Sequence, residues 1–110
     1  MVEKQEILNF LQKSIVFSNS ERVLELLRFY ITAENYNRDL SIILCEIFSI
    51  CHRLINVIDE WFEGQDDKGN ILKYADITDE QIYVLEWMLD SLEIYKEDLK
   101  KYNINFEFLN

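Results

Sequence analysis

The chain has 110 residues, no proline and only two glycines, with 49% hydrophobic and 29% charged residues. This length suits one domain with a core of its own, and the scarcity of turn-forming residues excludes a fold built on many tight turns. A formal charge of −10 makes direct binding to nucleic acid or to an anionic membrane unfavourable. We therefore expect an all-α protein, an antiparallel four-helix bundle spanning residues 1–110 with one polar loop at about 64–77 and a short C-terminal extension.

The N-terminal third predicts two helices. The first covers residues 2–17, with Ile7, Leu8, Leu11 and Ile15 facing inward. Ser18 followed by Glu21 matches a capping box, in which each side chain bonds to a backbone N–H at the start of a helix. The pattern thus predicts that the first helix ends at residues 18–20 and that a second begins near Asn19. The inward residues of the second helix are expected to be Val23, Leu24, Leu27 and Ile31.

The stretch 40–62 predicts the central helix. Its apolar residues alternate steps of four and three, which gives one stripe at 3.6 residues per turn: Leu40, Leu44, Ile47, Cys51, Leu54, Ile58 and Trp61. Further apolar residues widen this face until mainly Glu46, Ser49, Arg53, Asn56 and Glu60 are left for water. Such a helix is expected to be touched on several sides. Asn37 can cap its start, and the short link before it favours antiparallel neighbours.

The cysteines and the chain ends indicate a cytoplasmic protein. No apolar run approaches the roughly 18 residues of a membrane span, and the first residues lack the pattern of a signal peptide. Cys45 and Cys51 point about 120° apart on one helix, so we expect two small buried residues and no disulfide. His52 lies about 10 Å along the helix from Cys45, too far to share a metal ion with it.

The polar loop at about 64–77 and the C-terminal residues carry weaker signals. The loop holds both glycines, but with Gly69 in the sixth position of a calcium loop, Ala75 would occupy the twelfth, which requires an oxygen ligand. We therefore expect no metal and no cofactor. The ranges 71–77 and 104–108 match short extended segments because their apolar residues alternate or cluster.

The last helix begins with the clearest start signal in the chain. Thr78 and Gln81 match a capping box, and Asp79 and Glu80 lie where the helix dipole favours negative charge. The pattern predicts a helix to about Tyr102. Its expected inward face consists of Ile82, Leu85, Met88, Leu89, Leu92, Tyr95 and Leu99.

The charge of the protein is concentrated in residues 59–98, which hold 13 acidic and 3 basic residues. Within the last helix, acidic residues recur at steps of seven, four, three and four, and so form an acidic stripe: Asp79, Glu86, Asp90, Glu93 and Glu97. Beside this stripe and away from the expected core lie Tyr83, Trp87 and Ile94. An ordinary solvated helix face carries no tryptophan.

Two interpretations of Tyr83, Trp87 and Ile94 are open at this point. In the first, the C-terminal residues Phe106, Phe108 and Leu109 fold back over them, and the acidic stripe only keeps the protein soluble. In the second, the apolar side chains are exposed and rimmed by carboxylates, as on a surface that docks a basic protein. The apolar anchors then supply affinity, and the charge supplies steering and selectivity.

The sequence favours a binding protein over an enzyme. It contains no P-loop, no dinucleotide fingerprint and no HExxH motif, and the neighbouring Asp66 and Asp67 lack a partner that would separate their pKa values. The leading hypothesis is a small acidic cytoplasmic protein that blocks a basic protein partner through Tyr83, Glu86, Trp87, Asp90, Glu93, Ile94 and Glu97. The alternative is a structural module that self-associates through its exposed aromatics, which the high net charge would resist.

In size, charge and helical content the whole chain resembles bacterial immunity proteins. That resemblance implies a function as an inhibitor that neutralises a nuclease toxin by covering its positively charged active site. A phage inhibitor that mimics the charge of DNA would have the same general character. No motif carries the resemblance, so no site residue follows from it.

Overall fold

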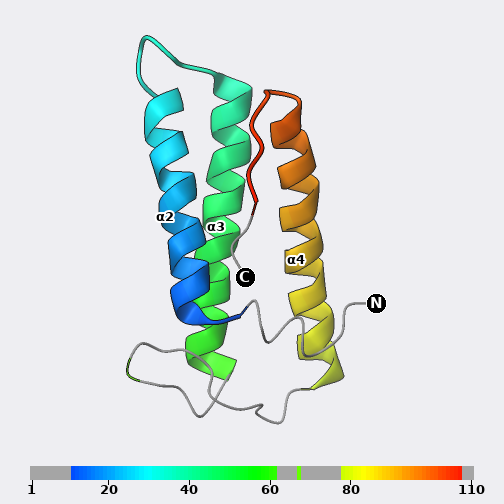
Figure 1. Cartoon of the computed structure of the whole chain (residues 1–110). Helices are drawn as coiled ribbons and strands as arrows, with labels where there is room; N and C mark the ends of the chain where they lie inside the picture. Colours follow the sequence, from blue (N-terminus) through cyan, green and yellow to red (C-terminus); the bar gives the residue numbers. More distant parts are fainter. Residues whose placement is uncertain (1–10, 62–66, 68–77, 108–110) are drawn as a thin grey trace.

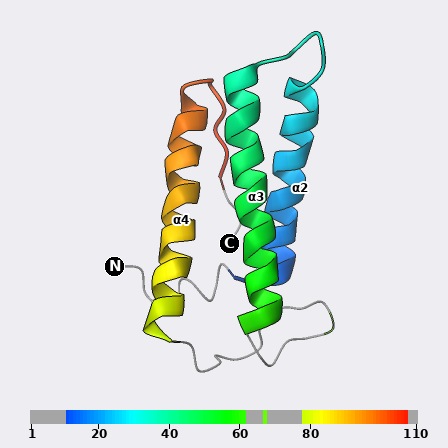
Figure 2. The same cartoon turned by 180° about the vertical axis from the view of Figure 1, so that it is seen from behind.

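A computed structural model describes residues 11–61, 67 and 78–107, and its regular structure there is entirely helical. The helices are α2 (Lys13–Tyr30), α3 (Arg38–Trp61) and α4 (Asp79–Lys100). Helix α2 runs antiparallel to α3, and α4 lies on the other side of α3, again antiparallel to it (Figures 1 and 2). The all-α class is therefore confirmed. The four-helix bundle is not, because the described ranges contain three helices.

The predicted break at residues 18–20 is wrong, because α2 continues through it. The Ser18 hydroxyl does not cap a new helix but donates to the Ser14 carbonyl oxygen at 2.9 Å, one turn back in the same helix. Asn19 and Ser20, read as turn residues, are buried. The part of the predicted first helix that precedes residue 11 lies outside the described residues. Of the second predicted apolar face, Ile31 follows the end of α2 and is 55% exposed.

The turn between α2 and α3 is closed by Asn37, as predicted. Its side-chain Oδ1 accepts a hydrogen bond from the Leu40 N–H at 3.0 Å, which satisfies a free donor at the start of α3. The Asn37 N–H in turn donates to the Tyr30 carbonyl oxygen at 3.2 Å. At the opposite end of the same helix pair, the Lys13 ammonium lies 2.9 Å from the Asp59 carboxylate. The antiparallel pairing of α2 and α3 is thus fixed at both ends.

Helix α3 is the centre of the core. Trp61, at the end of the predicted stripe, is half-buried. The other six residues of the stripe are at most 1% exposed: Leu40, Leu44, Ile47, Cys51, Leu54 and Ile58. By length and composition α3 would also qualify to cross a membrane, but half of its apolar 18-residue window is buried against the rest of the fold. The central helix of a globular core can be as long and as apolar as a membrane-spanning helix, because it is buried on several sides.

Helix α4 begins as the sequence predicts. The Gln81 N–H donates to Thr78 Oγ1 at 3.1 Å, and the Thr78 N–H donates to Gln81 Oε1 at 2.9 Å, so both halves of the capping box form. The inward face is also confirmed, because Ile82, Leu85, Leu92 and Leu99 are buried, and Met88, Leu89 and Tyr95 pack against the core.

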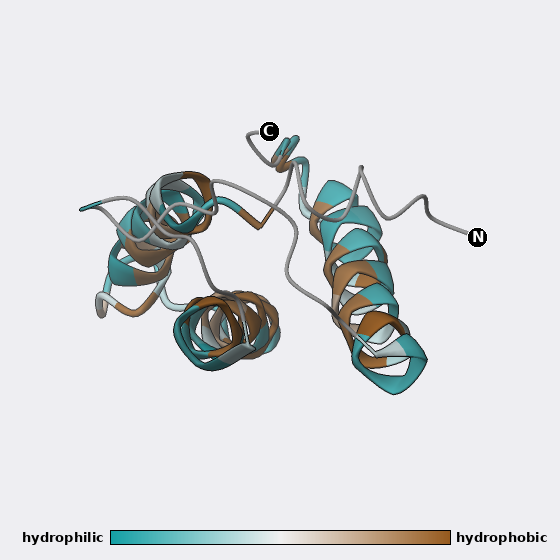
Figure 3. Ribbon diagram, turned by 90° about the horizontal axis from the view of Figure 1, so that it is seen from below, coloured by the Kyte–Doolittle hydropathy of each residue, from teal (hydrophilic) through white to brown (hydrophobic). Residues whose placement is uncertain are grey.

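After α4 the chain turns back and runs along the bundle as an extended C-terminal strap, residues 103–107. Asn103 adopts a left-handed conformation (φ 62°), which asparagine tolerates better than most residues, and the Ile104 N–H donates to the Leu99 carbonyl oxygen at 3.2 Å. The strap then passes between α2 and α4 (Figures 1 and 3). The predicted alternation is present, with Phe106 buried and Asn105 and Glu107 exposed, but residues 104–107 pair with no strand in the described ranges. The other predicted extended segment, 71–77, lies outside the described residues, as does most of the polar loop.

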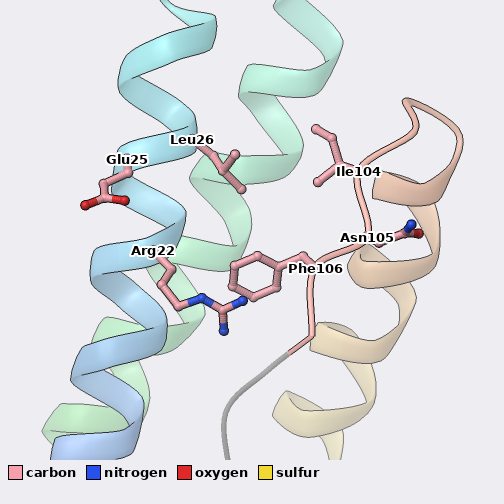
Figure 4. Close-up of a pocket in the computed structure, with 6 residues that line it drawn as sticks. All are labelled: Arg22, Glu25, Leu26, Ile104, Asn105 and Phe106. Atoms are coloured by element: carbon pink, nitrogen blue, oxygen red, sulfur yellow. The ribbon is translucent and has the colours of Figure 1, made fainter.

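The strap contacts both neighbouring helices, and Figure 4 shows its contact with Arg22 of α2. The Arg22 guanidinium of α2 lies 4.4 Å from the centre of the Phe106 ring, and its Nη1 donates to the Glu107 carbonyl oxygen at 2.6 Å. On the other side, the Lys96 ammonium of α4 lies 2.9 Å from the Glu107 carboxylate. This contact raises the pKa of Lys96 and lowers the pKa of Glu107. The strap therefore links α2 to α4 through one backbone and two side-chain contacts.

Candidate partner-binding surface on helix α4

The outer face of α4 exposes three large apolar residues. Trp87 is 71% exposed, Tyr83 is 70% exposed and Ile94 is 62% exposed. They fall opposite the buried residues of α4 because residues at i, i+4 and i+11 share one side of a helix. We call these three residues the apolar ridge.

The described part of the strap does not cover the apolar ridge. Phe106 is 4% exposed and packs in the core against Arg22 of α2, on a different side of α4. Phe108 and Leu109, the other residues expected to fold back, lie outside the described residues.

The acidic stripe runs beside the apolar ridge, and its charge is only partly compensated. Near the end of α4, Glu97 lies 2.9 Å from the Lys100 ammonium, and Glu93 lies 3.7 Å from that of Lys96. Both pairs are at the surface, where such contacts stabilise a protein by at most about 1 kcal/mol.

In the first two-thirds of α4 the stripe has no such compensation. Within the described residues no cation lies within ion-pair distance of Asp79, Glu86 or Asp90. The carboxylates of the stripe that have no ion-pair partner in the described residues therefore lie nearer to Tyr83 and Trp87 than to the end of α4.

On the side of the ridge that faces α3 there is a shallow groove of about 190 Å³. Helix α4 contributes Trp87, Met88, Ser91 and Tyr95 to its lining, and α3 contributes Glu46, Ile50 and Arg53. Trp87 thus belongs both to the apolar ridge and to the groove, so a side chain that docks on its indole can also enter the space between the helices. We call this space the α3–α4 groove.

Sequence reasoning placed Glu46 and Arg53 on the solvent face of the central helix, and both are exposed. It did not connect them with Trp87. The helical period shows only that these two residues point away from the stripe of α3. Their place beside the tryptophan depends on which flank of α3 receives α4, and no local signal specifies that choice.

The two cysteines and the histidine give no site. Cys51 is buried as expected, and burial raises the pKa of its thiol to about 12, so it stays protonated. Cys45 is exposed, contrary to the expectation, because the apolar face of α3 is narrower on that flank. His52 is also exposed, with its ring centre 4.4 Å from that of Phe48. In the described ranges, no three acidic, cysteine or histidine side chains gather closely enough to hold a metal ion.

In comparisons with known proteins, no family model, no curated protein and no solved structure matches this chain.

Proposed function

We propose that this protein is a small acidic binding protein that docks a basic protein partner on the outer face of α4 and blocks it. The observation that carries the proposal is the exposure of Trp87, 71% of whose surface faces solvent beside carboxylates without a cationic partner in the described chain. Contact of such a large apolar ring with water is unfavourable in the free protein. A partner that covers the Trp87 ring removes this contact, and the free energy gained favours binding. The surrounding charge selects which partner does so.

The two kinds of residue have separate roles in this proposal. Trp87 and Tyr83 bury apolar area and set the lifetime of the complex, because central aromatic residues dominate interface energies. Glu86 and Asp90 attract a positively charged surface before contact, which raises the association rate. A blocked nuclease or nucleic-acid-binding protein fits this chemistry, since such a partner carries a basic surface for phosphate.

Self-association through the same surface is disfavoured by the geometry. Two copies that meet ridge to ridge would bring two acidic stripes together, and like charges at an interface cost several kcal/mol. The basic partner is therefore the proposed function, and a second copy is an outcome that sedimentation at low and high salt would detect.

The first test separates binding from stability by truncating Trp87. In an extract of the native host, immobilised protein should retain basic proteins, and Trp87→Ala should lose them while its thermal midpoint stays nearly unchanged. Tyr36→Ala is the matched control, because Tyr36 is 61% exposed but lies in the turn between α2 and α3. With a retained protein purified, Trp87→Ala should weaken binding by more than about 2 kcal/mol, mostly through faster dissociation.

The second test addresses the acidic stripe. Reversing Glu86 and Asp90 to lysine should slow association with that partner, and the difference from wild type should shrink as salt rises, since screening acts over about 10 Å at 0.1 M. A retained partner that is acidic, or one that Trp87→Ala binds as well as Tyr36→Ala does, would contradict the proposed function.

A further inference from the structure

The α3–α4 groove has opposite charges at its two ends. Helices α3 and α4 are antiparallel (Figures 1 and 2), so residues early in α3 lie beside residues late in α4. Of the residues that line the groove, Glu46 is therefore at the Tyr95 end and Arg53 is at the Trp87 end. Seven residues of helix separate Glu46 from Arg53, which is about 10 Å along the axis. That distance is too long for the two side chains of α3 to neutralise each other as an ion pair.

Both charges are available to an occupant of the groove. Glu46 and Arg53 are exposed, and no partner within ion-pair distance of either is found in the described residues. Between them the groove is lined by the apolar side chains of Ile50 and Met88 and by Ser91, together with Trp87 and Tyr95. The groove is thus a partly apolar seat with a carboxylate at one end and a guanidinium at the other.

A purely basic occupant does not fit this seat. A lysine or arginine that follows the acidic stripe and reaches the Trp87 end would approach Arg53, and two like charges there oppose binding. A carboxylate at that position can instead accept two parallel hydrogen bonds from the guanidinium of Arg53. At the Tyr95 end the preference is the opposite, because Glu46 attracts a cation.

We propose that the α3–α4 groove binds one segment of the basic partner in a fixed direction, with a cationic side chain at Glu46, an apolar side chain in the middle and a carboxylate at Arg53. This inference rests on the proposed function and adds the orientation of the partner to it. Reversal of the segment places like charges together at both ends, so the groove rejects the opposite direction as well as accepting the correct one.

The experiment uses random peptides of about fifteen residues displayed on phage, long enough to span the groove either as a helix or as an extended chain. Selection is carried out on three proteins: wild type, Trp87→Ala, and the double variant Glu46→Arg with Arg53→Glu. The double variant keeps the composition and net charge of the wild type. Since both positions are exposed, its thermal midpoint should match that of the wild type.

Wild type should enrich basic peptides that carry one acidic residue, with the cation and the acid in a constant order along the peptide. The double variant should enrich the same composition in the reverse order. A synthetic copy of an enriched peptide and its charge-reversed counterpart should differ by at least about tenfold in affinity for the wild type, and the ratio should invert for the double variant.

The two proposals fail in different ways. If basic peptides are enriched by the wild type and lost by Trp87→Ala, but show no charge order or the same order on the double variant, the directional groove is wrong and the proposed function stands. If the wild type enriches no basic peptides, or Trp87→Ala enriches them equally, both proposals are wrong.

Discussion

Phe106 is the residue through which the C-terminal strap is expected to hold α4 in place. Its ring is 4% exposed and lies under the Arg22 guanidinium, at the edge of a cavity of about 280 Å³ between α2 and the strap (Figure 4). Truncation of a buried phenylalanine to alanine costs about 3–5 kcal/mol through lost burial and the cavity left behind. The neighbouring cavity lets the site relax, which favours the lower end of that range, and loss of the contact with Arg22 adds about 0.5–1 kcal/mol. We therefore expect Phe106→Ala to lower the free energy of unfolding by about 3–4 kcal/mol.

Urea unfolding followed by circular dichroism measures this loss. With a slope of about 1.5 kcal/mol per molar urea for a protein of this size, the midpoint should fall by about 2 M. Asn105→Ala is the control, because Asn105 is the exposed neighbour in the same strap, and its change should stay within about 0.5 kcal/mol. If Phe106→Ala leaves too little folded protein, Phe106→Leu should cost about 1 kcal/mol. A loss below about 1 kcal/mol for Phe106→Ala would show that the strap does not stabilise the fold.

On the central helix, Ile47→Ala and Leu54→Ala should each lower the free energy of unfolding by about 2–5 kcal/mol, because both side chains are buried. At the exposed Asn56, the change to alanine should alter it by less than about 0.5 kcal/mol. Equal effects in urea titrations would show that the buried face of α3 is not the one that carries Ile47 and Leu54. Thiol reagents should modify the exposed Cys45 in the native protein and leave the buried Cys51 unmodified, as measured by mass spectrometry of the labelled peptides. Labelling of Cys51 in preference to Cys45 would contradict this prediction. Burial raises the pKa of Cys51 to about 12, so as pH rises its thiol ionises in the unfolded chain at a lower pH than in the folded protein. The free energy of unfolding should therefore fall as pH rises above about 9, and it should fall less steeply in Cys51→Ala.

Local sequence predicted helices α3 and α4 correctly, because their capping residues and their apolar periodicity indicate the same helix. On α3 the apolar stripe follows from a 3.6-residue period, and six residues of the predicted stripe are at most 1% exposed. The Asn37 cap follows from an asparagine just before the helix, whose side chain reaches a backbone N–H three residues on. The start of α4 follows from Thr78 and Gln81, because a capping box involves only residues three positions apart and needs no distant contact. The exposure of Trp87 likewise follows from its place on the side of α4 opposite the buried residues.

The tertiary structure decided where local signals competed. Ser18 and Glu21 match a helix start, but Asn19 and Ser20 are buried, and α2 is continuous because burial of its inner face outweighs a cap of about 1 kcal/mol. The alternation in residues 104–107 predicts an extended segment but not its destination, which depends on Arg22, more than eighty residues earlier in the chain.

The composition of the α3–α4 groove was decided in the same way. Glu46 and Arg53 become neighbours of Trp87 only because α4 packs on one particular flank of α3. The sequence thus predicts which side of each helix is buried, whereas the pairing of flanks depends on contacts between residues far apart in the chain, which a local period does not encode.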